Sequence, residues 1–404
     1  MSESIERSTV LSGMRPTGRL HLGHYHGVLK NWVNLQTQHD SFFFVADWHA
    51  LTTHYEEPSI MSANVWEMVV DWLAAGIDPD KATLFIQSRL PQHAELHLLL
   101  SMVTPLGWLE RVPSFKDQQQ RMTDRDLATY GFLGYPLLQS ADILMYRANW
   151  VPVGEDQVPH VELTREIARR FNFIFGRDKD FDRKVEATLD RFDKNEASLL
   201  MKCRRSWLQD GKVEARKKAV DLVANSKNIS NEDRERLIGY IDGTGRLILK
   251  EPEALLTEAA RLPGLDGKKM SKSYNNAISM RDDPDRVAAA IRSMPTDPAR
   301  KRRDDPGEPD KCPVWDLHQV YTENPVRDGL ASGCRSASIG CVDCKKPLIE
   351  AIVEEQAFFR ERAKTYEDDP KQVQQIIADG CAKAEVVAER TLQEVRSVVG
   401  MIYD

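Results

Sequence analysis

The sequence predicts an α/β fold, a doubly wound, Rossmann-like parallel sheet that is followed by helical regions. Apolar runs typical of strands, at residues 8–14, 42–46 and 82–88, alternate with segments of helical spacing. Strands that alternate with helices favour a parallel sheet with right-handed crossovers. Ligands of such sheets bind beside the carboxyl ends of the strands, so the loops that follow these strands are candidate sites.

The first half of the chain contains the elements of this sheet in order. The run at residues 8–14 ends in a glycine turn, and residues 24–38 carry apolar side chains at helical spacing. "FFFVA" at residues 42–46 is continuously apolar, as in a strand buried on both faces. Ser59 is expected to cap the next helix, which Gly76 would end.

Downstream of the sheet, the sequence predicts mostly helices. Residues 182–250 hold 16 Lys and Arg against 12 Asp and Glu, which favours either a solvated surface or a phosphate-backbone contact. Asp-Pro pairs start two later helices, and residues 300–347 are expected to be irregular. The predicted organisation is a catalytic domain at 1–181, a helical insertion at 182–250, a loop and linker at 251–280 and a helical domain at 281–404.

Composition narrows the class of protein. The chain has 404 residues, of which 41% are hydrophobic and 29% charged, as in an ordinary globular protein. Its net charge of −7 gives no overall attraction to nucleic acid. The apolar runs are too short to span a bilayer, and the polar N-terminus lacks the apolar core of a secretion signal. We therefore expect a cytoplasmic protein.

The stretch "PTGRLHLGHYHG" at residues 16–27 carries three histidines after a glycine turn. A turn that leads into a helix directs free backbone N–H groups and the positive end of the helix dipole at an anion. His21 and His24 could then donate to phosphate oxygens, whereas His26 is expected to be structural. A metal site at His21 and His24, or histidines without a function, are the alternatives.

A second candidate loop, "DGKKMSKSYNN" at residues 266–276, concentrates positive charge. Lys268, Lys269 and Lys272 lie in a stretch that has no acidic residue from Gly267 to Asn276. Such a loop suits a polyphosphate whose charge must be stabilised as it departs. The alternative is an exposed basic loop without a ligand.

Together, "HLGH" at 21–24 and "KMSKS" at 269–273 resemble the paired signature of the class I aminoacyl-tRNA synthetases. "YPLLQSADILMY" at 135–146 and "VPVGEDQVPHVELTREIARRFN" at 151–172 are similar to blocks of the tryptophanyl-tRNA synthetases within that class. The resemblance covers about residues 8–178 and 252–404 and omits the insertion. It implies a Rossmann-like catalytic domain and an anticodon-binding domain at 281–404.

The resemblance also implies which residues bind ATP and stabilise the phosphate charge. The catalytic set would be His21, His24, Lys269 and Lys272. The ATP-binding set would be Arg15, Pro16, Thr17, Gly23, His24, Gly154, Glu155, Asp156, Leu262, Lys269, Met270, Ser271, Lys272 and Ser273.

For tryptophan, the resemblance implies that Asp142 accepts the indole N–H, because indole offers one donor and no acceptor. Tyr135 and Gln157 match residues near the substrate amino group, and Gly13, Val151 and Val153 would line the pocket. Gln139 stands where several members of the family have an apolar residue, which bears on the polarity of the pocket.

Four cysteines form the pattern C-x21-C-x6-C-x2-C, at Cys312, Cys334, Cys341 and Cys344. Four thiolates suit a tetrahedral zinc ion or a 4Fe–4S cluster. Some tryptophanyl enzymes carry a nearly identical spacing and bind a 4Fe–4S cluster there, so a cluster is the favoured prediction, ahead of zinc and of unmetallated thiols.

The implied function is a tryptophan–tRNA ligase that uses ATP and Mg²⁺, with L-tryptophan and tRNA(Trp) as substrates and a homodimer as its assembly. Three alternatives stay open: a tyrosyl-tRNA synthetase, a synthetase-like tRNA-binding paralogue without aminoacylation, and a His/Cys metal-binding regulatory protein.

Overall fold

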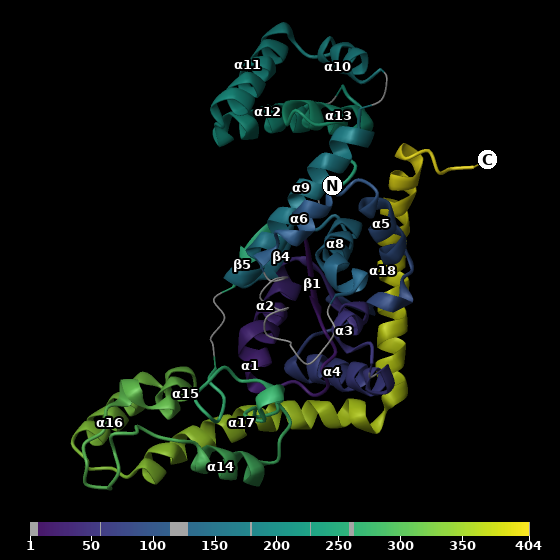
Figure 1. Cartoon of the computed structure of the whole chain (residues 1–404). Helices are drawn as coiled ribbons and strands as arrows, with labels where there is room; N and C mark the ends of the chain where they lie inside the picture. Colours follow the sequence, from purple (N-terminus) through teal and green to yellow (C-terminus); the bar gives the residue numbers. More distant parts are fainter. Residues whose placement is uncertain are drawn as a thin grey trace. The chain divides into compact units, whose positions relative to one another are not determined.

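A computed structural model describes residues 7–56, 58–113, 128–177, 180–226, 228–257 and 262–403, apart from the side chains of Pro58 and Ser273. Its strands form a five-stranded sheet in the order β3-β2-β1-β4-β5. Strands β1, β4 and β5 are labelled in Figure 1. The strands are β1 (Thr9–Met14), β2 (Asp40–Val45), β3 (Ala82–Ile86), β4 (Trp150–Val153) and β5 (Glu253–Leu256). The pairs β2–β3, β1–β4 and β4–β5 are parallel. This order confirms the predicted doubly wound α/β fold.

The chain divides into two compact units. The first unit comprises residues 1–12, 87–256 and 381–404, and the second comprises residues 13–86 and 257–380. Both histidines of "HLGH" and the whole of "KMSKS" belong to the second unit. The predicted indole-reading carboxylate, Asp142, belongs to the first.

In the second unit, the N-terminal helices are α1 (Leu22–His24), a π-helical turn (Tyr25–Leu29), α2 (Lys30–Gln38), α3 (Asp47–His54) and α4 (Met61–Ala75). The prediction that Ser59 caps α4 is wrong, because Ser59 lies in a 3₁₀ turn and Ile60 is the N-cap. The predicted end of α4 is confirmed: Gly76 has φ +105° and its N–H bonds back to Leu73 and Trp72.

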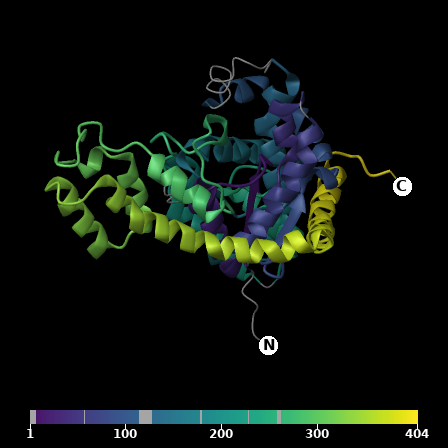
Figure 2. The ribbon, with the colours of Figure 1, turned by 90° about the horizontal axis from the view of Figure 1, so that it is seen from below.

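The C-terminal part of the second unit is built on the long helix α17 (Cys341–Asp368), which packs against α4 (Figure 2). Helices α14 (Pro284–Ser293), α15 (Pro313–Tyr321) and α16 (Asn324–Arg335) pack on α17. The prediction of an irregular segment at 300–347 is therefore wrong over α15, α16 and the start of α17. The Asp-Pro helix start is confirmed at α14, where the Asp283 side chain accepts the Asp285 N–H.

In the first unit, α8 (Tyr130–Met145) packs between α5 (Gln92–Ser101) and α9 (Val158–Phe175), and α6 (Leu106–Glu110) also contacts it. The C-terminal helix α18 (Pro370–Val398) begins in the second unit and ends in the first. Within the first unit, Arg396 on α18 bonds to both carboxylate oxygens of Glu95 on α5, at 2.7 and 2.6 Å. No described helix is both long and apolar enough to cross a membrane.

Every described element of the inserted segment of the first unit is a helix (Figure 1). These helices enclose a core of their own. Its helices are α10 (Phe181–Leu189), α11 (Lys194–Asp210), α12 (Val213–Asn225) and α13 (Asn231–Ile241). The core includes Phe181, Leu200, Val223 and Leu237, all nearly inaccessible to solvent. The two ends of the insertion meet, because the Arg246 N–H donates to the Gly176 carbonyl at 2.9 Å.

Candidate active site

The two signature motifs flank a short backbone pairing within the second unit. The Leu22 N–H donates to the Ile278 carbonyl, and the Met280 N–H donates to the Leu20 carbonyl, each at 2.9 Å. His21 and Ser279 form an antiparallel bridge between these bonds. This pairing holds the first motif against the chain that leaves the second one.

His21 and His24 stack on one another, with ring centroids 3.7 Å apart and planes at 25°. Burial, reinforced by nearby Lys272 and Lys269, lowers the pKa of His21 to about 4. Burial, His21 and the same lysines lower the pKa of His24 to about 3. Both imidazoles are therefore neutral at pH 7, so in this state they offer hydrogen bonds and not positive charge.

Among the described contacts, Lys272 is the charged side chain of the second motif that bonds to the turn just before the first motif. Its Nζ donates to the backbone carbonyl of Thr17 at 2.6 Å. Burial lowers the pKa of Lys272 to about 8, although Asp71 acts in the opposite direction. Gly18 follows Thr17 at φ +82°, and a Cβ there would lie 3.7 Å from Lys272 Nζ. The cation thus sits against a turn that favours glycine.

Asn276 shapes the lysine-rich loop, and the sequence analysis did not single it out. Its side chain donates to Asp266 Oδ1 at 2.6 Å and to the Lys269 carbonyl at 3.1 Å, and it accepts the Ser271 N–H at 2.7 Å. Met270 is buried beside it, whereas Lys269 is exposed. The loop therefore hides its methionine and presents its lysines. The predicted Leu262 is buried, and the side chain of Ser273 lies outside the described part.

A buried ion pair anchors the pairing between the two motif segments. Asp71, fully buried on α4, accepts the Leu20 N–H at 2.5 Å and the Arg281 Nε–H at 2.6 Å. Arg281 also bonds to Glu67 at 2.6 Å and to Glu367. No local pattern reveals this anchor, because Asp71 and Arg281 are 210 residues apart.

A second cluster lies in the first unit, around Asp142 on α8. Asp142 Oδ1 accepts from Gln87 Nε2 and bonds to His93 Nδ1, both at 2.7 Å. His93 Nε2 bonds to the Tyr146 hydroxyl at 2.8 Å. Each of these four side chains is at most 1% exposed. Sequence analysis predicted Asp142 but missed Gln87 and His93, which lie in the stretch "FIQSRLPQH" at residues 85–93.

The other predicted tryptophan residues of the first unit form a chain of hydrogen bonds. Gln157 Nε2 donates to Asp156 Oδ2 at 3.1 Å, and Gln157 Oε1 bonds to His160 Nδ1 at 2.7 Å. His160 Nε2 meets the Tyr135 hydroxyl at 3.4 Å. His160 is a further residue that the sequence analysis missed.

The remaining predicted residues divide between the units. In the first unit, Val151 is buried, Val153 and Gly154 are half-buried, and Glu155 and Asp156 are exposed. In the second unit, a Cβ on Gly13 would lie 2.4 Å from the Phe44 ring, so that position excludes a side chain. The second unit also holds Arg15, Pro16, Thr17 and Gly23.

His26, predicted to be structural, is bonded away from the first two histidines. Its Nε2 meets the Tyr321 hydroxyl at 2.9 Å and Glu355 Oε2 at 3.1 Å. These contacts tie the π-helical turn to α15 and α17.

The four clustered cysteines do not form a metal site in the described structure. All six cysteines of the chain are free thiols, and burial together with the neighbouring thiols raises the pKa of Cys344 to about 12. Cys344 Sγ lies 3.5 Å from His318 Nε2. Among the described residues, no group of three or more His, Cys, Asp or Glu could hold a metal ion. The prediction of a 4Fe–4S cluster or zinc therefore finds no support.

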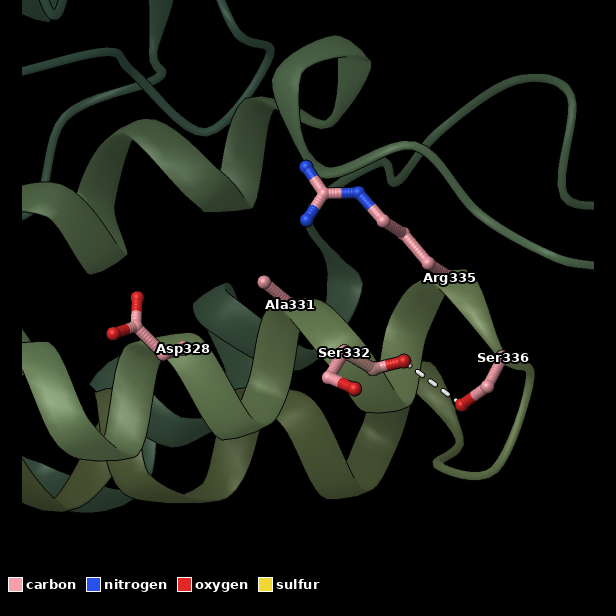
Figure 3. A pocket seen from close by; sticks show the side chains of 5 residues that line it. All are labelled: Asp328, Ala331, Ser332, Arg335 and Ser336. Carbon is pink, nitrogen blue, oxygen red and sulfur yellow. Dashed lines mark hydrogen bonds between the residues drawn. The ribbon is translucent and has the colours of Figure 1, made fainter.

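A separate hollow of about 520 Å³ lies along α16 (Figure 3). It is lined by Asp328, Ala331, Ser332, Arg335 and Ser336, and the Ser336 hydroxyl donates to the Ser332 carbonyl at 2.8 Å. None of the residues predicted for ATP or tryptophan lines this hollow.

Comparison with known proteins gives consistent results. Residues 3–194 and 223–356 match the family described as tRNA synthetases class I (W and Y). A tryptophan–tRNA ligase of Ralstonia nicotianae is 59% identical over 394 residues, which is 98% of each chain. One of Thermotoga maritima is 40% identical over 98% of this chain and 99% of its own.

Solved structures agree in fold. The tryptophanyl-tRNA synthetase of Campylobacter jejuni, complexed with ADP and tryptophan, superposes with a TM-score of 0.71 at 26% identity. That match covers 97% of this chain and 99% of the other. A tyrosyl-tRNA synthetase of Archaeoglobus fulgidus shares the fold at 20% identity and a TM-score of 0.52.

Proposed function

The chain belongs to the tRNA synthetases of class I (W and Y), and on this premise we propose that it is a tryptophan–tRNA ligase. It activates L-tryptophan with ATP and passes the tryptophanyl group to tRNA(Trp). The observation that carries the proposal is the paired backbone of residues 20–22 and 278–280, which joins the two signature loops. The full-length likeness to tryptophan–tRNA ligases supports the choice of amino acid.

In the first step, a carboxylate oxygen of tryptophan attacks the α-phosphorus of ATP. A new C–O–P linkage forms, the bond from the α-phosphorus to its bridging oxygen breaks, and pyrophosphate leaves. The attacking carboxylate is already ionised, so no side chain has to remove a proton. Catalysis then consists of positioning and charge stabilisation, and Mg²⁺ arrives with ATP as part of the substrate.

We propose that side chains around the paired loops stabilise the negative charge of the ATP phosphates. His21 and His24, neutral at pH 7, donate hydrogen bonds, and Lys269 and Lys272 supply positive charge. Lys272 exchanges the Thr17 carbonyl for a phosphate oxygen when ATP binds. From the resemblance to the family, we assign Arg15, Pro16, Thr17 and Gly23 to ATP, and Met270, Ser271 and Ser273 to its pyrophosphate. Gly154, Glu155 and Asp156 are assigned to the ribose and adenosine, and Leu262 to the adenine.

We assign recognition of the amino acid to Asp142 and to the hydrogen-bonded chain around His160. The Asp142 carboxylate accepts the indole N–H, and Tyr135 and Gln157 bind the substrate ammonium group. The hydrogen-bonded chain from Asp156 to Tyr135 supports this role, because it fixes the positions of the Gln157 amide and the Tyr135 hydroxyl. From the resemblance to the family, we also assign Gly13, Val151 and Val153 to tryptophan binding.

In the second step, a ribose hydroxyl at the 3′ end of tRNA attacks the tryptophanyl carbonyl carbon, and AMP leaves. We propose residues 1–181 as the catalytic domain, 182–250 as an insertion, 251–280 as the loop and linker, and 281–404 as the anticodon-binding domain. A homodimer in the cytoplasm is the assembly that we expect.

The metal predicted at Cys312, Cys334, Cys341 and Cys344 stays a hypothesis from the sequence alone. Its test is elemental analysis of anaerobically purified protein. Iron or zinc at one site per chain would support a metal centre, and protein without either element would overturn it.

The decisive experiment for the function is ATP–pyrophosphate exchange with single amino acids. Exchange that depends on L-tryptophan is the expected result. Exchange driven by L-tyrosine would favour a tyrosyl-tRNA synthetase instead. Tryptophan-dependent exchange without charging of tRNA(Trp) would favour a paralogue that forms the adenylate only.

A further inference from the structure

Asp142 lies at one end of a buried chain of polar groups that no other part of the proposed mechanism requires. Its Oδ1 forms hydrogen bonds with Gln87 Nε2 and His93 Nδ1, each at 2.7 Å. The other ring nitrogen of His93, Nε2, bonds to the Tyr146 hydroxyl at 2.8 Å. Both donors meet the same oxygen. A buried network of this kind is costly unless each of its members is satisfied, so its geometry is strongly constrained.

The roles of the atoms follow from what each can donate or accept. A carboxylate only accepts, so Nδ1 of His93 carries the proton that points to Asp142. In the neutral imidazole, Nε2 must then accept, and the Tyr146 hydroxyl donates to it. Burial and the nearby Asp142 raise the pKa of Tyr146 well above its usual value, so this hydroxyl keeps its proton. The order Tyr146 to His93 to Asp142 is thus a one-way chain of donors.

Gln87 adds an observation that points to a ligand. Its Nε2 is committed to Asp142, and its Oε1 is buried without a hydrogen-bond donor from the described residues. A buried acceptor that lacks a donor is costly, and such groups in native proteins call for an explanation. A bound tryptophan whose indole N–H lies between Asp142 and Gln87 provides one, because this single donor can be shared by both acceptors.

We propose that His93 is a positioning residue for tryptophan selection: together with Gln87 it fixes the Asp142 carboxylate so that it reads the indole N–H. This inference rests on the proposed function, because it needs Asp142 to contact the indole. Without the His93 donor, the Asp142 carboxylate can rotate, and its oxygen no longer keeps the orientation that accepts the indole N–H. Selection for the N–H then weakens, whereas contacts to the rest of the amino acid are kept.

The test compares L-tryptophan with its benzothiophene isostere, which has a sulfur in place of the N–H. ATP–pyrophosphate exchange gives kcat and KM for both amino acids with the full-length protein. The variant His93→Leu removes the donor, and His93→Gln keeps an N–H. Ser140→Ala is the matched control, because it removes an equally buried hydrogen bond on α8, from Ser140 to Thr164 at 2.9 Å, outside the Asp142 cluster.

For His93→Leu, we expect a KM for tryptophan about 10-fold higher or more, with kcat changed far less. The KM for the isostere stays constant, so the preference for tryptophan falls by the same factor. His93→Gln recovers most of the preference, and Ser140→Ala leaves it unchanged. Folded His93→Leu protein with wild-type preference would overturn the proposal, and so would an equal loss in Ser140→Ala.

Two further results separate this inference from the proposed function. If His93→Leu fails to fold, Tyr146→Phe, which keeps the imidazole, decides: a preference reduced about threefold supports the chain of donors, and an unchanged preference overturns it. If the wild-type protein shows no tryptophan-dependent exchange, or uses both amino acids equally, the proposed function or the role of Asp142 has failed, and the inference fails with it.

Discussion

Lys272 Nζ donates to the Thr17 carbonyl at 2.6 Å, across 255 residues of sequence. The contact places the lysine-rich loop against the segment that leads into the two histidines. A backbone carbonyl is a neutral acceptor, whereas a phosphate oxygen carries charge and binds a cation more strongly. On the proposed function, we expect Lys272 to leave the Thr17 carbonyl for a phosphate oxygen when ATP binds.

The first prediction concerns this lysine. We expect Lys272→Ala to lower the rate of ATP–pyrophosphate exchange by about 100-fold or more, because removing one group that stabilises transition-state charge has costs of this order. Tryptophan affinity, measured by equilibrium dialysis, should stay near wild type. Lys268→Ala is the control, since Lys268 is an exposed lysine of the same loop outside the assigned set. Equal losses in both variants would mean that only the loop's total charge matters.

A second prediction concerns alkaline pH. Burial lowers the pKa of Lys272 to about 8, so the cation is present below that pH and is lost as pH rises through it. We expect kcat/KM for ATP to fall on the alkaline side with an apparent pKa near 8, because this parameter reports the free enzyme. In Lys272→Arg, whose guanidinium stays charged, the alkaline decline should vanish even if the absolute rate is lower. A decline that persists in this variant would belong to another group.

A third prediction tests the anchor behind the two loops. Arg281 is 4% exposed and bonds to Asp71, which is fully buried. Arg281→Met should lower the free energy of unfolding by about 3–5 kcal/mol, because it leaves a buried carboxylate without its partner. Urea denaturation measures this change. Arg19→Met is the comparison, since Arg19 pairs with Glu67 at 2.9 Å but is 54% exposed, and the loss there should be at most about 1 kcal/mol.

The contrast between predicted and missed residues has a physical basis. Strands β1, β2 and β3, the helix stop at Gly76 and the cap at Asp283 are encoded within a few residues, so local patterns suffice to predict them. Ser59 had the right chemistry for a cap, but a 3₁₀ turn precedes the helix there.

Long-range partners are different. Gln87, in the 3₁₀ turn after β3, and His93, on α5, meet Asp142 only in the folded chain, where α5 packs on α8. Periodicity carries no information about which buried polar groups will meet. The same holds for Asp71 with Arg281. The metal prediction shows the reverse case: the cysteine spacing suits a chelating site, but the described thiols are not arranged as one.

The last prediction concerns the insertion. Helices α10 to α13 enclose a core of their own, and the ends of the insertion meet where the Arg246 N–H bonds to the Gly176 carbonyl at 2.9 Å. Asn172, four residues before Gly176, bonds to the chain that leaves the insertion. Its Nδ2 donates to the Leu249 carbonyl at 2.7 Å, and its Oδ1 accepts the N–H groups of Ile248 and Leu249. Because this closure lies outside the inserted helices, a short linker can replace them without straining the sheet.

We expect a variant in which two glycines replace residues 177–245 to fold and to keep tryptophan-dependent exchange within about threefold of wild type, since such closed surface segments tolerate excision. Charging of tRNA(Trp), measured on the same protein across salt concentrations, then reveals what the insertion does. If its excess of Lys and Arg contacts tRNA, KM for tRNA rises and its salt dependence weakens. If the folded variant loses ATP–pyrophosphate exchange, adenylate formation needs the insertion, and the prediction is wrong.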